Sequence, residues 1–142
     1  MSTALAAPSL PSPTVLRRNP AAQAFVLLWI AFTVAPVLFG IDKFAEVLTG
    51  DWTRYLAPEF NDILPGSAQD AMYLVGGVEI AAGLVVLVAP RFGGLLVAGW
   101  LAGIIVSLLL VGGYGDIALR DFGLLIGALA LSRLATADYA ER

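Results

Sequence analysis

Residues 76–83 read Gly-Gly-Val-Glu-Ile-Ala-Ala-Gly, and they place one carboxylate, Glu79, inside the otherwise uncharged segment 71–89. An α-helix rises ~1.5 Å per residue, so a helix that begins just before this segment carries Glu79 to a depth of ~14 Å, near the middle of a ~30 Å hydrocarbon layer. A charge at that depth is costly and normally faces the interior of a bundle, beside an opposite charge or water. Gly76 and Gly83 share the helical face of Glu79, where another helix can approach closely.

The composition indicates an all-α integral membrane protein. Of the 142 residues, 59% are hydrophobic and 13% are charged, whereas soluble domains average about 25% charged residues. The net charge of −3 and the absence of a basic run argue against nucleic-acid binding. The sequence contains no Cys and no His, so it lacks thiol chemistry and the commonest metal and haem ligand. We predict no metal site and no catalytic residue, and a redox role would need an organic cofactor such as a quinone, or a partner's metal.

Four apolar segments predict an antiparallel four-helix transmembrane bundle. We expect spans over residues 21–41, 70–89, 92–112 and 116–132, with the first helix continuing past Asp42-Lys43-Phe44 and kinked at Pro36. Residues 1–20 are rich in Ala, Ser and Pro and predict a disordered tail, residues 21–135 form the membrane domain, and residues 136–142 form a polar tail. A signal peptide is the competing interpretation of the first run, but the run is too long and no small-x-small cleavage site follows it.

The long connection over residues 46–69 mixes aromatic and charged side chains. Such a mixture suits the headgroup layer, so we expect Trp52, Arg54 and Tyr55 to be interfacial and residues 52–56 to form a short interfacial helix between the first two spans. After this helix, Pro58, Pro65 and Gly66 are expected to interrupt helical structure. The alternative is a lid over a cavity among the helices.

The fourth span is unusual because only residues 122–132 are free of charge, which is ~16 Å of helix. To cross, it must begin near Asp116, the predicted N-cap, and carry Arg120 and Asp121 into the membrane edge. Four spans put both termini on one side. That side holds five arginines against three basic residues on the other, so the termini are predicted to be cytoplasmic.

Three charges in three different spans predict a buried polar cluster of Glu79 with Arg120, Lys43 or both. Asp121 is adjacent to Arg120 and therefore on a different face, where it would meet Lys43 or Arg54. Glycines lie on the faces of these charges or at small-xxx-small spacing, and we expect them to form helix contacts: Gly40, Gly76, Gly83, Gly99, Gly103, Gly123 and Gly127. Two interpretations stay open, a polar contact that only orders the helices, and a quinone or proton site.

Two motifs resemble those of DoxX-like membrane proteins. Residues 39–44, Phe-Gly-Ile-Asp-Lys-Phe, resemble the Gly-x-x-Lys signature of that family, and residues 76–83 followed by Pro-Arg-Phe-Gly at 90–93 resemble its second signature. The resemblance implies a four-helix protein of the bacterial inner membrane, with Lys43 and Glu79 at the positions of the family's polar residues. It also implies association with membrane redox or oxidative-stress complexes, among them thiosulfate:quinone oxidoreductases.

The leading functional hypothesis is a small accessory, non-catalytic subunit of a membrane electron-transfer complex that contributes to a quinone site. A proton-coupled or small-solute carrier is the second hypothesis, and a purely structural lipid-facing subunit is the third. The expected partners are the lipid bilayer and either other membrane subunits or further copies of this chain.

Overall fold

The computed structural model describes residues 10–63 and 66–136, and this part of the chain is helical and contains no strand. Three of its helices are long and apolar enough to cross a membrane: α2 (Pro20–Ala45), α4 (Ala68–Val88) and α5 (Pro90–Val111). The remaining elements are α1 (Pro13–Arg18), the 3-10 helix η2 (Trp52–Tyr55), α3 (Pro58–Ile63) and α6 (Gly115–Leu134). α6 has 20 residues, so it matches the others in length, but its first turns carry charge.

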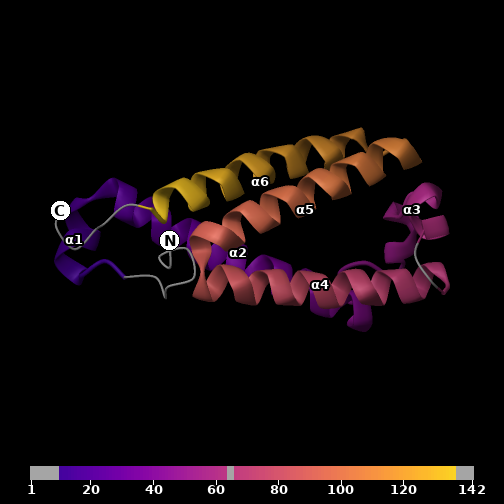
Figure 1. The fold of residues 1–142 in the computed structure, drawn as a ribbon, viewed down its shortest axis with the longest axis horizontal. Helices are drawn as coiled ribbons and strands as arrows, with labels where there is room; N and C mark the ends of the chain where they lie inside the picture. The colour runs from indigo at the N-terminus through magenta and orange to yellow at the C-terminus, as the bar shows by residue number, and fades with distance from the viewer. Residues whose placement is uncertain (1–9, 64–65, 137–142) are drawn as a thin grey trace.

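The long helices pack as two pairs, α2 with α4 and α5 with α6. Neighbouring helices run in alternating directions, and the α5–α6 pair diverges from α4 toward the end where α3 lies (Figure 1). The hydrophobic core lies toward the opposite end, where Phe25, Val86 and Leu131 are almost completely buried among alanines of all four long helices. Small core residues let the two pairs approach there, while the other end stays wider.

The helix boundaries follow local capping chemistry. Ser67 and Asp70 form a reciprocal capping box at the start of α4. A single residue, Ala89, separates the end of α4 from Pro90, the first residue of α5. Because proline has no N–H, the carbonyl of Val86 lacks its usual helical donor. The indole of Trp29 donates to that carbonyl over 3.1 Å and also lies 3.2 Å from the carbonyl of Leu87. A side chain from α2 thereby completes the turn between α4 and α5.

Three expectations about helix ends need correction. The predicted disordered tail is partly outside the described residues, but Pro13–Arg18 forms a helix because Ser12 caps it and Val15 packs into the core. Pro58 begins α3 instead of breaking structure, since proline fits the first turn of a helix. Asp116 is not the N-cap of α6, because the helix already begins at Gly115 and no side chain caps it. Pro65 lies outside the described residues.

Glycines bring α2 and α4 into backbone contact. A Cβ atom at Gly40 would lie 2.6 Å from the carbonyl oxygen of Gly76, and one at Gly76 would lie 2.8 Å from that of Gly40. A Cβ atom at Gly83 would lie 2.8 Å from the carbonyl oxygen of Thr33. These three glycines form what we call the glycine seam, which confirms their predicted packing role.

The other predicted glycine contacts are mixed. A Cβ atom added at Gly127 would lie 3.2 Å from the ring of Phe32, whereas Cβ atoms added at Gly99, Gly103 and Gly123 would meet nothing within 4 Å. These three glycines are exposed, so within the described residues they make no close helix contact. Cβ atoms added at Gly93 and Gly94, which were not predicted, would lie 2.5 Å from Val86 of α4 and 2.7 Å from Ala128 of α6.

Adjacent glycines of α4 provide a matched test of the seam. Gly76→Ala should destabilise the protein by about 1–3 kcal/mol, because the new methyl group overlaps the backbone of α2. Gly77→Ala should be neutral or stabilise the protein by up to about 1 kcal/mol, because nothing lies within 4 Å of its Cβ position and alanine favours the helix. Thermal unfolding of the two variants in detergent measures the difference, and equal effects would contradict the seam.

Candidate functional site

The centre of the candidate site is an ion pair between α2 and α4. Nζ of Lys43 lies 2.7 Å from Oε2 of Glu79, and the two side chains are only 5% and 10% exposed. Lys43 follows Gly40 by three residues and Glu79 follows Gly76 by three, so each charge lies one helical turn from a seam glycine on the same face. The seam therefore brings the helix axes close enough for the two side chains to meet.

The indole of Trp52 covers the ion pair from the side of the connection between α2 and α4. Nζ of Lys43 lies 4.0 Å from the centroid of the ring, within the range of a cation–π contact. The indole nitrogen donates a hydrogen bond over 2.9 Å to Oδ2 of Asp42, the residue before Lys43. One aromatic side chain thus contacts both charged neighbours at the end of α2.

Asp42 is 4% exposed and organises the chain reversal that returns Trp52 to α2. Its carboxylate accepts from the backbone N–H groups of Val47 and Leu48 over 2.8 Å and from that of Thr49 over 3.2 Å. These groups follow a helix end at which Glu46 adopts a left-handed conformation with φ of 55°. A carboxylate that accepts several backbone hydrogen bonds holds such a turn in one conformation.

The far side of the connection is fixed to α5 by Ser107, which is buried. Its hydroxyl donates to the carbonyl of Tyr55 and accepts from the N–H of Ala57, both over 2.9 Å. The ring of Tyr55 also contacts that of Tyr114, which precedes α6, at a centroid distance of 5.0 Å. The connection therefore spans from α2 to α5 across the end where the helix pairs diverge (Figure 1).

The remaining predicted site residues lie apart from the ion pair. Arg120 is exposed, and among residues 10–63 and 66–136 the Lys43–Glu79 contact is the one ion pair formed. Asp121 is half-buried and lies within electrostatic range of Glu79, but among the described residues it forms no ion pair with Lys43 or Arg54, the partners suggested for it. Arg54 is exposed and lies over the ring of its neighbour Tyr55 at 4.9 Å.

This arrangement has the groups needed to bind a polar head group or move a proton. An ammonium donor, a carboxylate and an indole face lie together inside otherwise apolar helices. In the part of the chain that the structure describes, no group of three acidic side chains is arranged to hold a metal ion. The ammonium donor beside an aromatic face is a donor set that a carbonyl-bearing organic molecule can use.

Sequence reasoning missed Asp42 and Ser107 as site residues. Ser107 had a usable signal, since it is the only hydroxyl within the apolar run of residues 92–111. Asp42 had a weaker signal, because its role depends on the path that the chain takes after α2. A short helix is found as η2 within the segment 52–56 for which one was expected. The side chain of Trp52 contacts Asp42 and Lys43 of α2, and the ring of Tyr55 contacts that of Tyr114.

Breaking the ion pair from either side should be costly. Lys43→Met or Glu79→Gln alone should lower stability by about 3–5 kcal/mol, because each leaves the opposite charge buried without its partner. The double variant Lys43→Met/Glu79→Gln should recover most of the loss, since it buries no charge. Unfolding of the four proteins in one detergent forms a double-mutant cycle, and additive losses would show that the two side chains do not interact.

Replacing Asp42 should loosen the connection without breaking the ion pair. Asp42→Asn replaces one carboxylate oxygen with an NH₂ donor, which must then face N–H donors of Thr49 or Trp52. Backbone amides of residues 47–56 should exchange hydrogen about tenfold faster or more, as expected for a loss of ~1.5 kcal/mol or more. Asp62→Asn, an exposed change in α3, is the control, and equal protection in both variants would contradict the role of Asp42.

Comparisons of the chain with models of protein families, with characterised proteins and with solved structures find no match. The resemblance to DoxX-like proteins therefore stays a prediction from the residues.

Proposed function

We propose that this chain is an antiparallel four-helix protein of the bacterial inner membrane and an accessory, non-catalytic subunit of an electron-transfer complex. Its polar site would receive a quinone head group. The observation that carries the proposal is the buried Lys43–Glu79 pair beneath Trp52, which joins the end of α2 to the middle of α4, two of the three apolar helices. Intramembrane ionisable groups commonly mark ligand or proton routes, and the DoxX-like motifs at these two residues support the same assignment.

The proposal requires α6 to cross the membrane with the other three long helices. Its 20 residues correspond to ~30 Å of helix, and it packs along the length of α5. The exposed Arg120 is near its start, where a long side chain reaches the headgroup layer by snorkelling. Asp121 is half-buried, so its carboxylate is partly shielded from the surroundings of the helix. The positions of both charges near the start of α6 support the proposal that this helix crosses.

A quinone suits the site because its carbonyl oxygens accept hydrogen bonds and its ring stacks on aromatic faces. Lys43 supplies a donor, Trp52 supplies an aromatic face, and the carboxylates of Glu79 and Asp121 supply positions for protons. When bound, a quinone takes up two electrons and two protons, and the electrons would come from a partner subunit. Lys43 is already engaged by both Glu79 and Trp52, so head-group entry requires Trp52 and its connection to move.

Purification in mild detergent tests this proposal. The protein should retain a quinone in its organic extract or co-purify with cytochromes detectable by absorbance. The variant Lys43→Met/Glu79→Gln, which keeps a neutral site of similar shape, should lose at least about tenfold in quinone content, as expected when charged hydrogen bonds of ~1.5 kcal/mol or more are removed. Arg54→Gln changes an exposed cation and serves as the control.

A different result would favour the carrier hypothesis. A homo-oligomer that holds neither quinone nor cytochrome, and that acidifies reconstituted vesicles when a small solute is added, would contradict the electron-transfer role. The observation that supports this second function is the half-buried carboxylate of Asp121, which has no ion-pair partner among the described residues, because intramembrane carboxylates commonly mark proton routes.

A further inference from the structure

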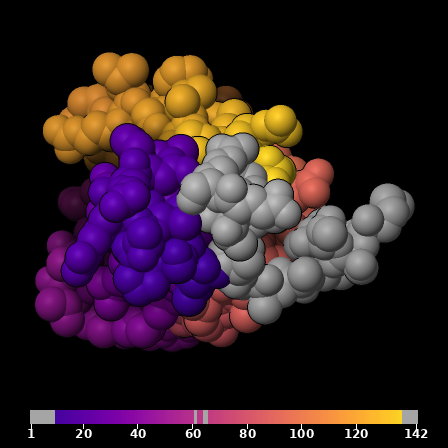
Figure 2. All heavy atoms as spheres, turned by 90° about the vertical axis from the view of Figure 1, so that its left-hand side faces the viewer, coloured from indigo at the N-terminus to yellow at the C-terminus, as the bar shows by residue number. Residues whose placement is uncertain are grey.

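Exposed arginines gather at the end of the molecule opposite the candidate site. This end, which we call the arginine end, holds α1, the start of α2, the turn from α4 to α5 and the last turn of α6. Its four exposed cations are Arg17, Arg18, Arg91 and Arg133. Figure 2 looks directly at it and shows the N-terminal helices, the α4–α5 turn and the end of α6 around one face.

Three contacts fix these elements against one another. The hydroxyl of Ser132 donates to the carbonyl of Arg91 over 2.7 Å, which ties the end of α6 to the start of α5. The side chain of Gln23 donates to the carbonyl of Leu16 over 2.8 Å, which ties α1 to α2. Val15 of α1 belongs to the same core cluster as Leu131 of α6. The arginines are therefore held at one end by packed elements.

No acidic side chain among residues 10–63 and 66–136 balances this charge. The described Asp and Glu residues lie in the last turn of α2, in the connection, at the start and in the middle of α4 or in the first two turns of α6. None of the four arginines forms an ion pair within the described part of the chain. Within the described residues, no ion pair neutralises the positive charge of the arginine end.

On both α5 and α6, an exposed apolar side chain lies one helical turn from the arginine, on the same face. Leu95, four residues after Arg91, is 53% exposed, and Leu129, four residues before Arg133, is 37% exposed. Residues four apart share a helical face, so on both helices a cation at the end is followed, toward the middle of the helix, by an apolar surface. A ligand with an anionic head and an apolar tail matches this order of surfaces.

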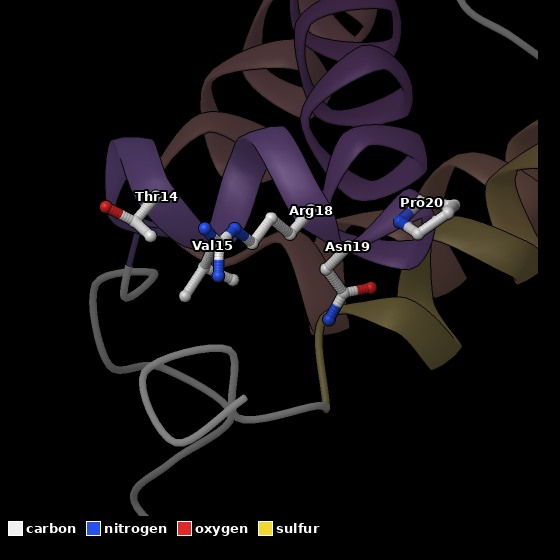
Figure 3. Close-up of a pocket in the computed structure, with 5 residues that line it drawn as sticks. All are labelled: Thr14, Val15, Arg18, Asn19 and Pro20. Atoms are coloured by element: carbon white, nitrogen blue, oxygen red, sulfur yellow. The ribbon is translucent and has the colours of Figure 1, made fainter.

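A shallow pocket in the same end adds a polar surface. It is lined by Thr14, Val15, Arg18, Asn19 and Pro20, at the junction of α1 and α2 (Figure 3). The amide oxygen of Asn19 accepts from the N–H groups that begin α2, so the donors that line the pocket are the Arg18 guanidinium, the Thr14 hydroxyl and the Asn19 NH₂ group. Guanidinium groups bind phosphate through paired hydrogen bonds.

We propose that the arginine end binds the phosphate head group of an anionic phospholipid, with its acyl chains along the exposed faces of α5 and α6. The head group meets Arg18, Arg91 and Arg133, and the chains meet Leu95 and Leu129. An acidic protein segment would satisfy the arginines but not the apolar surfaces that follow them, so lipid fits better. This inference rests on the membrane placement in the proposed function and not on the electron-transfer role.

The test uses the full chain in a neutral detergent with short-chain phosphatidylglycerol, short-chain phosphatidylcholine or inorganic phosphate. Phosphatidylglycerol should raise the thermal unfolding temperature in a saturable manner, while phosphatidylcholine and phosphate should not. The variant Arg18→Gln/Arg91→Gln/Arg133→Gln should bind phosphatidylglycerol about 100-fold more weakly, because each cation near a membrane surface contributes roughly fivefold in affinity. The matched control Arg54→Gln/Arg120→Gln removes two exposed cations from the other end and should bind as the unchanged protein does.

Three results would overturn the inference. Equal stabilisation by phosphatidylcholine would show no selectivity for anionic lipid, and equal stabilisation by phosphate would assign the site to a free anion. Equally weakened binding in the control variant would show that the lipid does not bind at the arginine end. Native mass spectrometry of retained lipid reads out the same comparison if the triple variant is itself less stable. A protein that stays soluble without detergent would overturn the membrane placement as well, whereas a membrane protein without lipid selectivity would overturn this inference alone.

Discussion

The contact between Lys43 and Glu79 is the interaction on which the arrangement of the first helix pair depends. A buried charge is tolerated only when an opposite charge lies beside it in good geometry, and here Nζ and Oε2 are 2.7 Å apart. That distance is reached because Gly40 and Gly76 remove the side chains that would separate α2 from α4. The seam and the ion pair therefore require each other: close backbones without the pair would leave a charge exposed to apolar surroundings, and the pair without the seam could not form.

The two ends of the molecule are built in different ways. At the arginine end, small residues let all four long helices pack around Phe25 and Leu131. At the opposite end the helix pairs diverge, and the connection joins them through the carboxylate of Asp42 and the hydroxyl of Ser107. Hydrogen bonds replace hydrophobic packing at that end, so opening it costs fewer buried apolar contacts. Local openings are drawn from such regions of low contact density.

Trp52 links this connection to the charges beneath it. Its indole nitrogen donates a hydrogen bond to Asp42 while its ring lies over Lys43. A movement of the connection would therefore uncover the ion pair and break the hydrogen bond of the indole at the same time. A ligand able to stack on the indole and accept from the ammonium would offset both losses. The site and its cover therefore act as one unit.

Helical periodicity was enough to put Lys43 among the candidate partners of Glu79, because each charge shares a face with glycine in an otherwise apolar run, but it did not choose between Lys43 and Arg120. The same reasoning failed for Arg120 and for Gly99 with Gly103, since spacing defines a face but not what that face meets. Gly93 and Gly94 were missed because their contacts with Val86 and Ala128 depend on how tightly the chain turns at Pro90. Asp42 was missed because its partners come from a loop whose path no pattern encodes.

The charge count of the site separates a functional interpretation from a purely structural one. Lys43 neutralises Glu79, whereas the half-buried carboxylate of Asp121 has no ion-pair partner within residues 10–63 and 66–136. A polar contact that served only to order the helices would need the Lys43–Glu79 pair and nothing more. A partly buried carboxylate without a counter-charge costs folding free energy, and such a cost is typical of sites where a proton or a ligand is received. The unpaired Asp121 is therefore the feature that our proposed function explains and that a contact serving only to order helices leaves unexplained.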